Sequence, residues 1–159
     1  MKVLAIDPGY DRIGIAVIEN SKTGEIIHYS TCIETNKTDE FSSRIYALGL
    51  QIEKLLAEHK PDSVAIETLF FNKNIKTAIG VSQARGMIIY LAKKFDCAIY
   101  EFGPQEIKIA TTGYGKSDKN AVIMMVKKLV KNAPEKALDD EYDAIAVGIT
   151  CLAHHAKSR

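Results

Sequence analysis

The sequence predicts an α/β domain with a mixed five-stranded sheet and helices on both faces. Two observations lead to this class. Residues 2–35 hold three runs typical of β-strands with only short turns between them, as in an antiparallel meander. Beyond them, short apolar runs alternate with longer segments that have the 3.6-residue period of helices. A meander followed by alternating strands and helices combines antiparallel and parallel pairing in one sheet.

Each element has its own signal. The first strand is apolar and ends at the turn sequence Asp7-Pro8-Gly9. Thr38 or Asp39 is the expected cap of the first helix, and Ser117 that of the fourth. The expected strands are 2–6, 13–18, 25–35, 63–67 and 97–102; the expected helices are 39–59, 75–95, 104–110, 118–131 and one from 139 or 140 to 154, with a loop at 111–116.

The composition indicates one soluble globular unit. The 159 residues suit a single domain spanning 1–159, and no apolar run is long enough to cross a membrane. The N-terminal apolar stretch breaks at a charged turn, so we expect no signal peptide, no membrane partner and a cytoplasmic location. Cys32, Cys97 and Cys151 form no CxxC pair and are expected to be buried, reduced thiols.

A formal net charge of +1 hides an uneven charge distribution. Residues 104–131 contain six lysines and two acids, whereas residues 134–143 contain five acids and one lysine. A basic stretch that runs into an acidic one suits a polyanionic ligand with a metal site beside it.

Four acids are candidates for one site: Asp7, Glu67, Asp140 and Asp143. Each has a simpler explanation when taken alone. Asp7 can be a turn former, Glu67 can emerge into solvent at a strand end, and the last two can complement a helix dipole. Two strand ends and one helix start converge, however, in the ribonuclease H-like fold, which fits this element order. Four carboxylates that share a metal-free site should raise at least one pKa by mutual repulsion.

The ordered motifs resemble the RuvC family of Holliday-junction resolvases along essentially the whole chain. The segments that carry the resemblance are Ile6-Asp7-Pro8-Gly9, Ala65-Ile66-Glu67, Phe70, Asn72-Lys73-Asn74, Gln83-Ala84-Arg85-Gly86, Tyr100-Glu101, Lys108, Gly113-Tyr114-Gly115, Lys119 and Asp140–Asp143 with the following Ala144-Ile145-Ala146-Val147.

This resemblance implies a structure-selective DNA endonuclease of recombination and repair, which makes paired symmetric nicks in a four-way junction. The four acids would hold two Mg²⁺ ions, with Mn²⁺ as a substitute. Phe70 would stack on a base at the junction, although a core position or a role for the adjacent Phe71 is the alternative. The resemblance also implies a homodimer and a RuvAB branch-migration complex. Its expected DNA contacts are Phe70, Lys73, Lys108, Lys116 and Lys119.

Three other functions compete with this reading. A nucleotide-binding protein of the actin, Hsp70 and sugar-kinase class can also have an Asp and glycines after a strand, but the chain is short for two lobes. A ribonuclease H-like enzyme that acts on RNA and a catalytically inactive DNA-binding module are the others.

Helix 75–95 is apolar around much of its circumference, which fits either a dimer interface or a fully buried helix.

Overall fold

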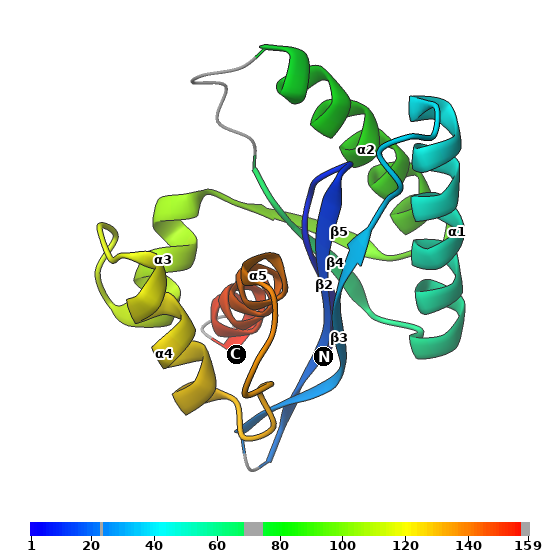
Figure 1. Cartoon of the computed structure of the whole chain (residues 1–159). Helices are drawn as coiled ribbons and strands as arrows, with labels where there is room; N and C mark the ends of the chain where they lie inside the picture. Colours follow the sequence, from blue (N-terminus) through cyan, green and yellow to red (C-terminus); the bar gives the residue numbers. More distant parts are fainter. Residues whose placement is uncertain (23, 69–74, 157–159) are drawn as a thin grey trace.

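The computed structural model describes residues 1–22, 24–68 and 75–156, except for the side chains of residues 75, 76 and 156. Every expected strand and helix is present in this part of the chain (Figure 1). In chain order the elements are β1 (Lys2–Asp7), β2 (Arg12–Ser21), β3 (Gly24–Glu34), α1 (Phe41–His59), β4 (Ser63–Glu67), α2 (Ile75–Lys94), β5 (Ala98–Phe102), α3 (Pro104–Thr112), α4 (Lys119–Leu129) and α5 (Asp139–Ala156).

The strands form one five-stranded sheet in the order β3-β2-β1-β4-β5. Strands β1, β2 and β3 pair antiparallel, and a bulge between Val17 and Ile18 interrupts the β2–β3 register. Strands β1, β4 and β5 pair parallel. The predicted mixed sheet is therefore confirmed, with β1 at its centre between an antiparallel and a parallel neighbour.

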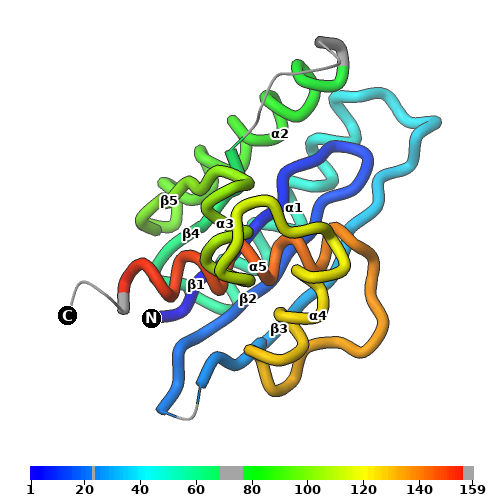
Figure 2. The backbone as a smooth tube through the Cα atoms, turned by 90° about the vertical axis from the view of Figure 1, so that its left-hand side faces the viewer, coloured from blue at the N-terminus to red at the C-terminus, as the bar shows by residue number. Residues whose placement is uncertain are grey.

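Helices cover both faces of the sheet, as predicted (Figure 1). Because side chains alternate along a strand, β1 sends Val3 and Ala5 into one core and Leu4 and Ile6 into the other. The first core includes residues of α3, α4 and α5, and the second includes residues of α1 and α2. Figure 2 shows α3 and α4 in front of α5 on one side of the sheet. None of the described helices is both long and apolar enough to cross a membrane.

Helix α5 lies unusually close to β1 and β2. Small residues make this approach possible: a Cβ added at Gly148 would lie 2.5 Å from the Ile18 side chain and 3.2 Å from Ala5. At the start of the helix, a Cβ added at Gly14 would lie 1.8 Å from the carbonyl oxygen of Asp140. The first turn of α5 therefore rests on the backbone of β2, close to the end of β1.

The expected helix caps were wrong. Helix α1 begins after Glu40 with no side-chain cap, because a local turn built on Asn36 already binds Thr38 and Asp39. Helix α4 is capped by Asp118, whose carboxylate accepts the Ala121 N–H at 2.8 Å.

Ser117 does not cap α4, because its hydroxyl donates to the Tyr114 carbonyl oxygen at 2.8 Å. Helix α3 runs two residues further than expected, to Thr112, and ends at Gly113 with a φ of 80°. The three cysteines are free thiols, as expected. Cys97 and Cys151 are buried, but Cys32 is only partly buried, contrary to the expectation.

Candidate active site

Two acids meet at the carboxyl ends of adjacent parallel strands. Strands β1 and β4 pair with Ile6 opposite Ile66, so Asp7 and Glu67 follow at the same edge of the sheet. On the other side of β1, Asp7 pairs with Gly14 of β2. The main chain thus fixes both carboxylates at one end of the sheet, where parallel strands present their ligand sites in α/β proteins.

Helix α5 brings the other two acids to the same place. Asp140 and Asp143 lie three residues apart in its first turns, and their charges act on Asp7. Because the helix starts against Gly14, the register partner of Asp7, its first turn is directed to the edge where the strands end. The four predicted acids therefore belong to one cluster in the fold.

Burial and the closeness of the acids raise the pKa values of three members of the cluster. Burial, then the charges of Glu67, Asp143 and Asp140, raise the pKa of Asp7 from 3.8 to about 8. Burial and the charge of Asp143 raise the pKa of Glu67 from 4.5 to about 7. Burial also raises the pKa of Asp143, although Lys119 opposes the shift. Repulsion between the carboxylates contributes to these shifts, as expected, but burial is the larger cause of each one.

Two basic residues pair with acids of the cluster. Lys119 Nζ lies 3.1 Å from Asp143 Oδ2 and 3.3 Å from Asp139 Oδ2. Partial burial acts to lower the pKa of Lys119, but its contacts with Asp143 and Asp139 raise it overall. Arg12 Nη2 lies 3.2 Å from Asp140 Oδ2.

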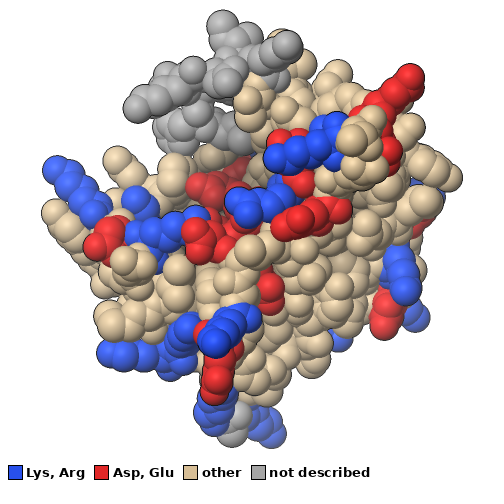
Figure 3. All heavy atoms as spheres, viewed as in Figure 1, with Lys and Arg blue, Asp and Glu red and all other residues tan. Residues whose placement is uncertain are grey.

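A cavity of about 220 Å³ opens between β4, α3, α4 and α5 beside the acids. Glu67 and Asp143 line it together with Lys108 and Lys119, and Pro104, Ile107 and Val122 supply apolar walls. Figure 3 shows acidic side chains gathered near the middle of this face, with lysine and arginine side chains among them. A negatively charged ligand can therefore meet lysines next to the carboxylates.

The acids have the chemistry of a magnesium or manganese site, because these cations prefer hard oxygen ligands. Burial and then repulsion between the acids raise the pKa of Asp7 and Glu67, and a divalent cation would stabilise their ionised forms. Oδ2 of Asp140 is buried and accepts no hydrogen bond among the described residues, although Arg12 Nη2 lies 3.2 Å from it. Among those residues, no group of three His, Cys, Asp or Glu side chains is already arranged as a finished metal site.

The remaining predicted site residues do not all lie beside the acids. Lys108 and Lys119 line the cavity, whereas Lys116 is exposed in the turn between α3 and α4. Phe70 and Lys73 lie outside the described residues. Sequence reasoning missed Arg12 and Gly14, since nothing in their spacing indicates that α5 returns to β2.

The sheet order and the place of the acids define the class of ribonuclease H-like proteins. A model of one family in this class, described as crossover junction endodeoxyribonuclease RuvC, matches residues 3–151. The chain belongs to the RuvC family. A RuvC from Thermosipho melanesiensis is 43% identical over 155 residues, which cover 96% of this chain and 97% of the relative. A RuvC from Petrotoga mobilis is 41% identical over 147 residues, which cover 92% of this chain and 90% of the relative.

Solved structures agree on the fold. A Thermus thermophilus RuvC in complex with a Holliday junction substrate matches with a TM-score of 0.93 at 23% identity, covering 99% of this chain and 96% of that one. A yeast mitochondrial Holliday junction resolvase matches with a TM-score of 0.72 at 17% identity, covering 98% of this chain and 79% of that one. At these identities the likeness is one of architecture, and it confirms the ribonuclease H-like fold.

Proposed function

We propose that this protein is an endonuclease that resolves four-way DNA junctions by nicking two opposed strands symmetrically. The observation that carries the proposal is the meeting of Asp7 and Glu67 with Asp143 at one end of the sheet, with pKa values of about 8 and about 7 for the first two. Family membership supplies the substrate, since the matching family is one of crossover junction endodeoxyribonucleases.

The four acids Asp7, Glu67, Asp140 and Asp143 would hold two Mg²⁺ ions, with Mn²⁺ as a substitute. When bound, such ions activate a water and stabilise the leaving oxygen of a phosphodiester. The chain itself contributes the rigid placement of the acids, because two of them end paired strands and two begin a helix packed on the sheet. The products would be a 5′-phosphate and a 3′-hydroxyl.

Lysines on the rim of the site would hold the DNA backbone without reading its sequence. Lys108 and Lys119 line the cavity at Glu67 and Asp143, so a phosphate beside the acids comes within their reach. Lys116, exposed on the turn before α4, would extend this contact. We further propose that Lys73 contacts the DNA and that Phe70 stacks on a base at the junction.

The assembly would be a homodimer of single domains, 1–159, in the cytoplasm. A four-way junction has two-fold symmetry, so two copies related by a two-fold axis can make paired nicks. Helix α2 supports this proposal, because Ile79 and Tyr90 are 57% and 66% exposed while Ile88 and Leu91 are buried in the core. A RuvAB branch-migration complex is the proposed larger partner.

A synthetic four-way junction tests the function. We expect symmetric nicks with Mg²⁺ and little cutting of a linear duplex or an RNA–DNA hybrid of the same sequence. Asp7→Asn serves as the inactive control. Preferential cutting of the hybrid would overturn the proposal in favour of an enzyme that acts on RNA.

A further inference from the structure

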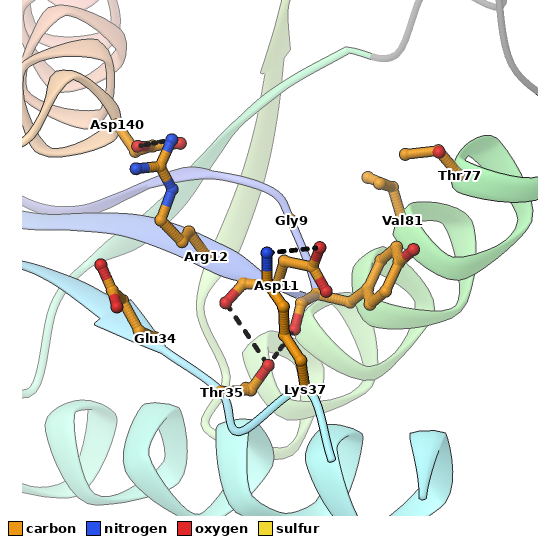
Figure 4. A pocket seen from close by; sticks show the side chains of 10 residues that line it. Gly9, Asp11, Arg12, Glu34, Thr35, Lys37, Thr77, Val81 and Asp140 are labelled. Carbon is orange, nitrogen blue, oxygen red and sulfur yellow. Dashed lines mark hydrogen bonds and ion pairs between the residues drawn. The ribbon is translucent and has the colours of Figure 1, made fainter. Parts of the chain in front are cut away.

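A second hollow, of about 480 Å³, adjoins the acidic cluster at Asp140. The turn between β1 and β2, the end of β3 and the segment after it, and the first turns of α2 enclose it (Figure 4). Its charged lining residues include Arg12, Lys37 and Glu34. Of the basic residues that line the hollow, Arg12 pairs with Asp140 of the acidic cluster, whereas Lys37 pairs with Asp11.

The contact between Arg12 and Asp140 is close but easily broken. The two atoms, Nη2 and Oδ2, lie 3.2 Å apart, yet Oδ2 accepts no hydrogen bond within the described residues. The two atoms are close enough for an ion pair but form no hydrogen bond, so attraction between charges holds the contact. The Arg12 side chain is 48% exposed, and such pairs are weak in water.

The other acids around the hollow do not hold Arg12 in its place. Asp11 already pairs with the buried Arg44, which also donates from Nε to Thr35 Oγ1 at 2.9 Å. Glu34 faces Arg12 across the β2–β3 ladder and lies on the side of Arg12 away from Asp140 (Figure 4). Arg12 therefore has open space and a second carboxylate nearby if it leaves Asp140.

Arg12 and a divalent cation would compete for the same atom, Oδ2 of Asp140. Asp140 is one of the four acids that would hold divalent cations under the proposed function, on which this step rests. A cation at Oδ2 and a guanidinium 3.2 Å away repel each other and compete for the same charge. A bound cation would therefore weaken the contact between Arg12 and Asp140.

We propose that Arg12 is the built-in counter-ion of Asp140 in the metal-free protein and that divalent cations displace it into the adjoining hollow. Arg12 is a positioning residue in this scheme. It keeps Asp140 beside the other acids when no metal offsets their repulsion, and it withdraws when the cation arrives.

The test is Mn²⁺ binding to the metal-free protein, measured by calorimetry without any DNA. Arg12→Gln removes the competing charge, so we expect Mn²⁺ to bind about twofold to fivefold more tightly than to the wild type. Lys37→Gln is the matched control, because Lys37 lines the same hollow, is 76% exposed and lies 3.9 Å from Asp11 rather than near Asp140. Lys37→Gln should change the Mn²⁺ affinity less than Arg12→Gln does. Equal affinities of wild type and Arg12→Gln, or equal effects of both variants, would overturn the inference.

A direct measurement covers the case in which Arg12→Gln folds poorly. The Nε–H signal of Arg12 in ¹⁵N spectra of the wild type, assigned with Arg12→Lys, should shift when Mg²⁺ saturates the protein. In Asp140→Asn the signal should resemble the Mg²⁺-bound one before any metal is added. A signal that saturating Mg²⁺ leaves unmoved contradicts the displacement. Wild type that binds neither Mn²⁺ nor Mg²⁺ would instead refute the proposed function.

Discussion

Gly14 lies directly against the main chain of Asp140, with room for a hydrogen atom but not for a methyl group. A Cβ at Gly14 would be 1.8 Å from the Asp140 carbonyl oxygen and 2.5 Å from its carbon. Both neighbours are backbone atoms, which cannot rotate away as a side-chain end can. Since Gly14 is also the register partner of Asp7, this contact sets how α5 sits relative to the end of β1.

Gly14→Ala should therefore disturb both stability and the site. We expect a loss of about 2–3 kcal/mol, or roughly 5–10 °C in melting temperature, from overpacking against rigid backbone. Junction cutting should fall much further than junction binding, because α5 has to move with Asp140. Gly49→Ala is the control, since its nearest atoms belong to the flexible Met87 side chain at 3.5 Å. Equal melting curves for the two variants would contradict the packing argument.

The four acids should be needed for cutting and dispensable for binding. We expect Asp7→Asn, Glu67→Gln, Asp140→Asn and Asp143→Asn each to abolish cutting while junction affinity in Ca²⁺ stays close to that of wild type. Asp139→Asn is the matched control. Asp139 lies in the first turn of α5 next to Asp140 and pairs with Lys119 of α4, but it is not one of the four acids. It should still cut. Loss of binding in all four variants would show that these acids are structural.

Metal-free protein should lose stability as pH rises, because of Asp7. Its pKa is about 8 in the folded state against 3.8 ordinarily, so the folded protein keeps a proton that the unfolded chain loses. Between these two pH values the folded state binds more protons, and the free energy of unfolding falls with increasing pH. The fall should be complete above about pH 8.

Asp7→Asn should make this dependence shallower, leaving the contribution of Glu67 with its pKa of about 7, and in EDTA at pH 8 it should melt higher than wild type. Asp143 is a poorer position for the same test, because Lys119 lies 3.1 Å from it and compensates its charge. Mg²⁺ should narrow or reverse the difference in melting temperature between Asp7→Asn and wild type, since it binds the ionised acids of the folded state. Melting curves from pH 5 to 8, with and without Mg²⁺, measure both effects. A wild-type curve that does not change with pH would rule out the raised pKa.

Lys119→Ala should weaken junction binding and reduce its salt dependence by about one phosphate contact. The reason is its place at the cavity rim, where it pairs with Asp143 and would be within reach of a phosphate of bound DNA. Lys128→Ala is the control, because Lys128 is exposed in the last turn of the same helix. Plots of log affinity against log salt with parallel slopes for wild type and Lys119→Ala would exclude the contact.

The sequence by itself determined the elements and the candidate acids. Hydrophobic period is a local property, so β4 at 63–67 and the helices on either side could be recognised without knowledge of their neighbours. The acids stood out because they follow a strand or begin a helix, and their order along the chain resembled one family. Helix caps could not be predicted reliably, because Asp118 competes with Ser117 through turn geometry that the sequence does not specify.

Only the tertiary structure decided which charges meet. Arg12 and Asp140 are far apart in the chain, and their ion pair exists because α5 packs on β2 at Gly14. Lys119 reaches Asp139 and Asp143 for a similar reason, since α4 packs beside α5. Long-range packing sets such distances, and electrostatic energies depend on distance and burial rather than on sequence spacing. The sequence thus identified the four candidate acids, and the fold determined that Arg12 and Lys119 form ion pairs with two of them.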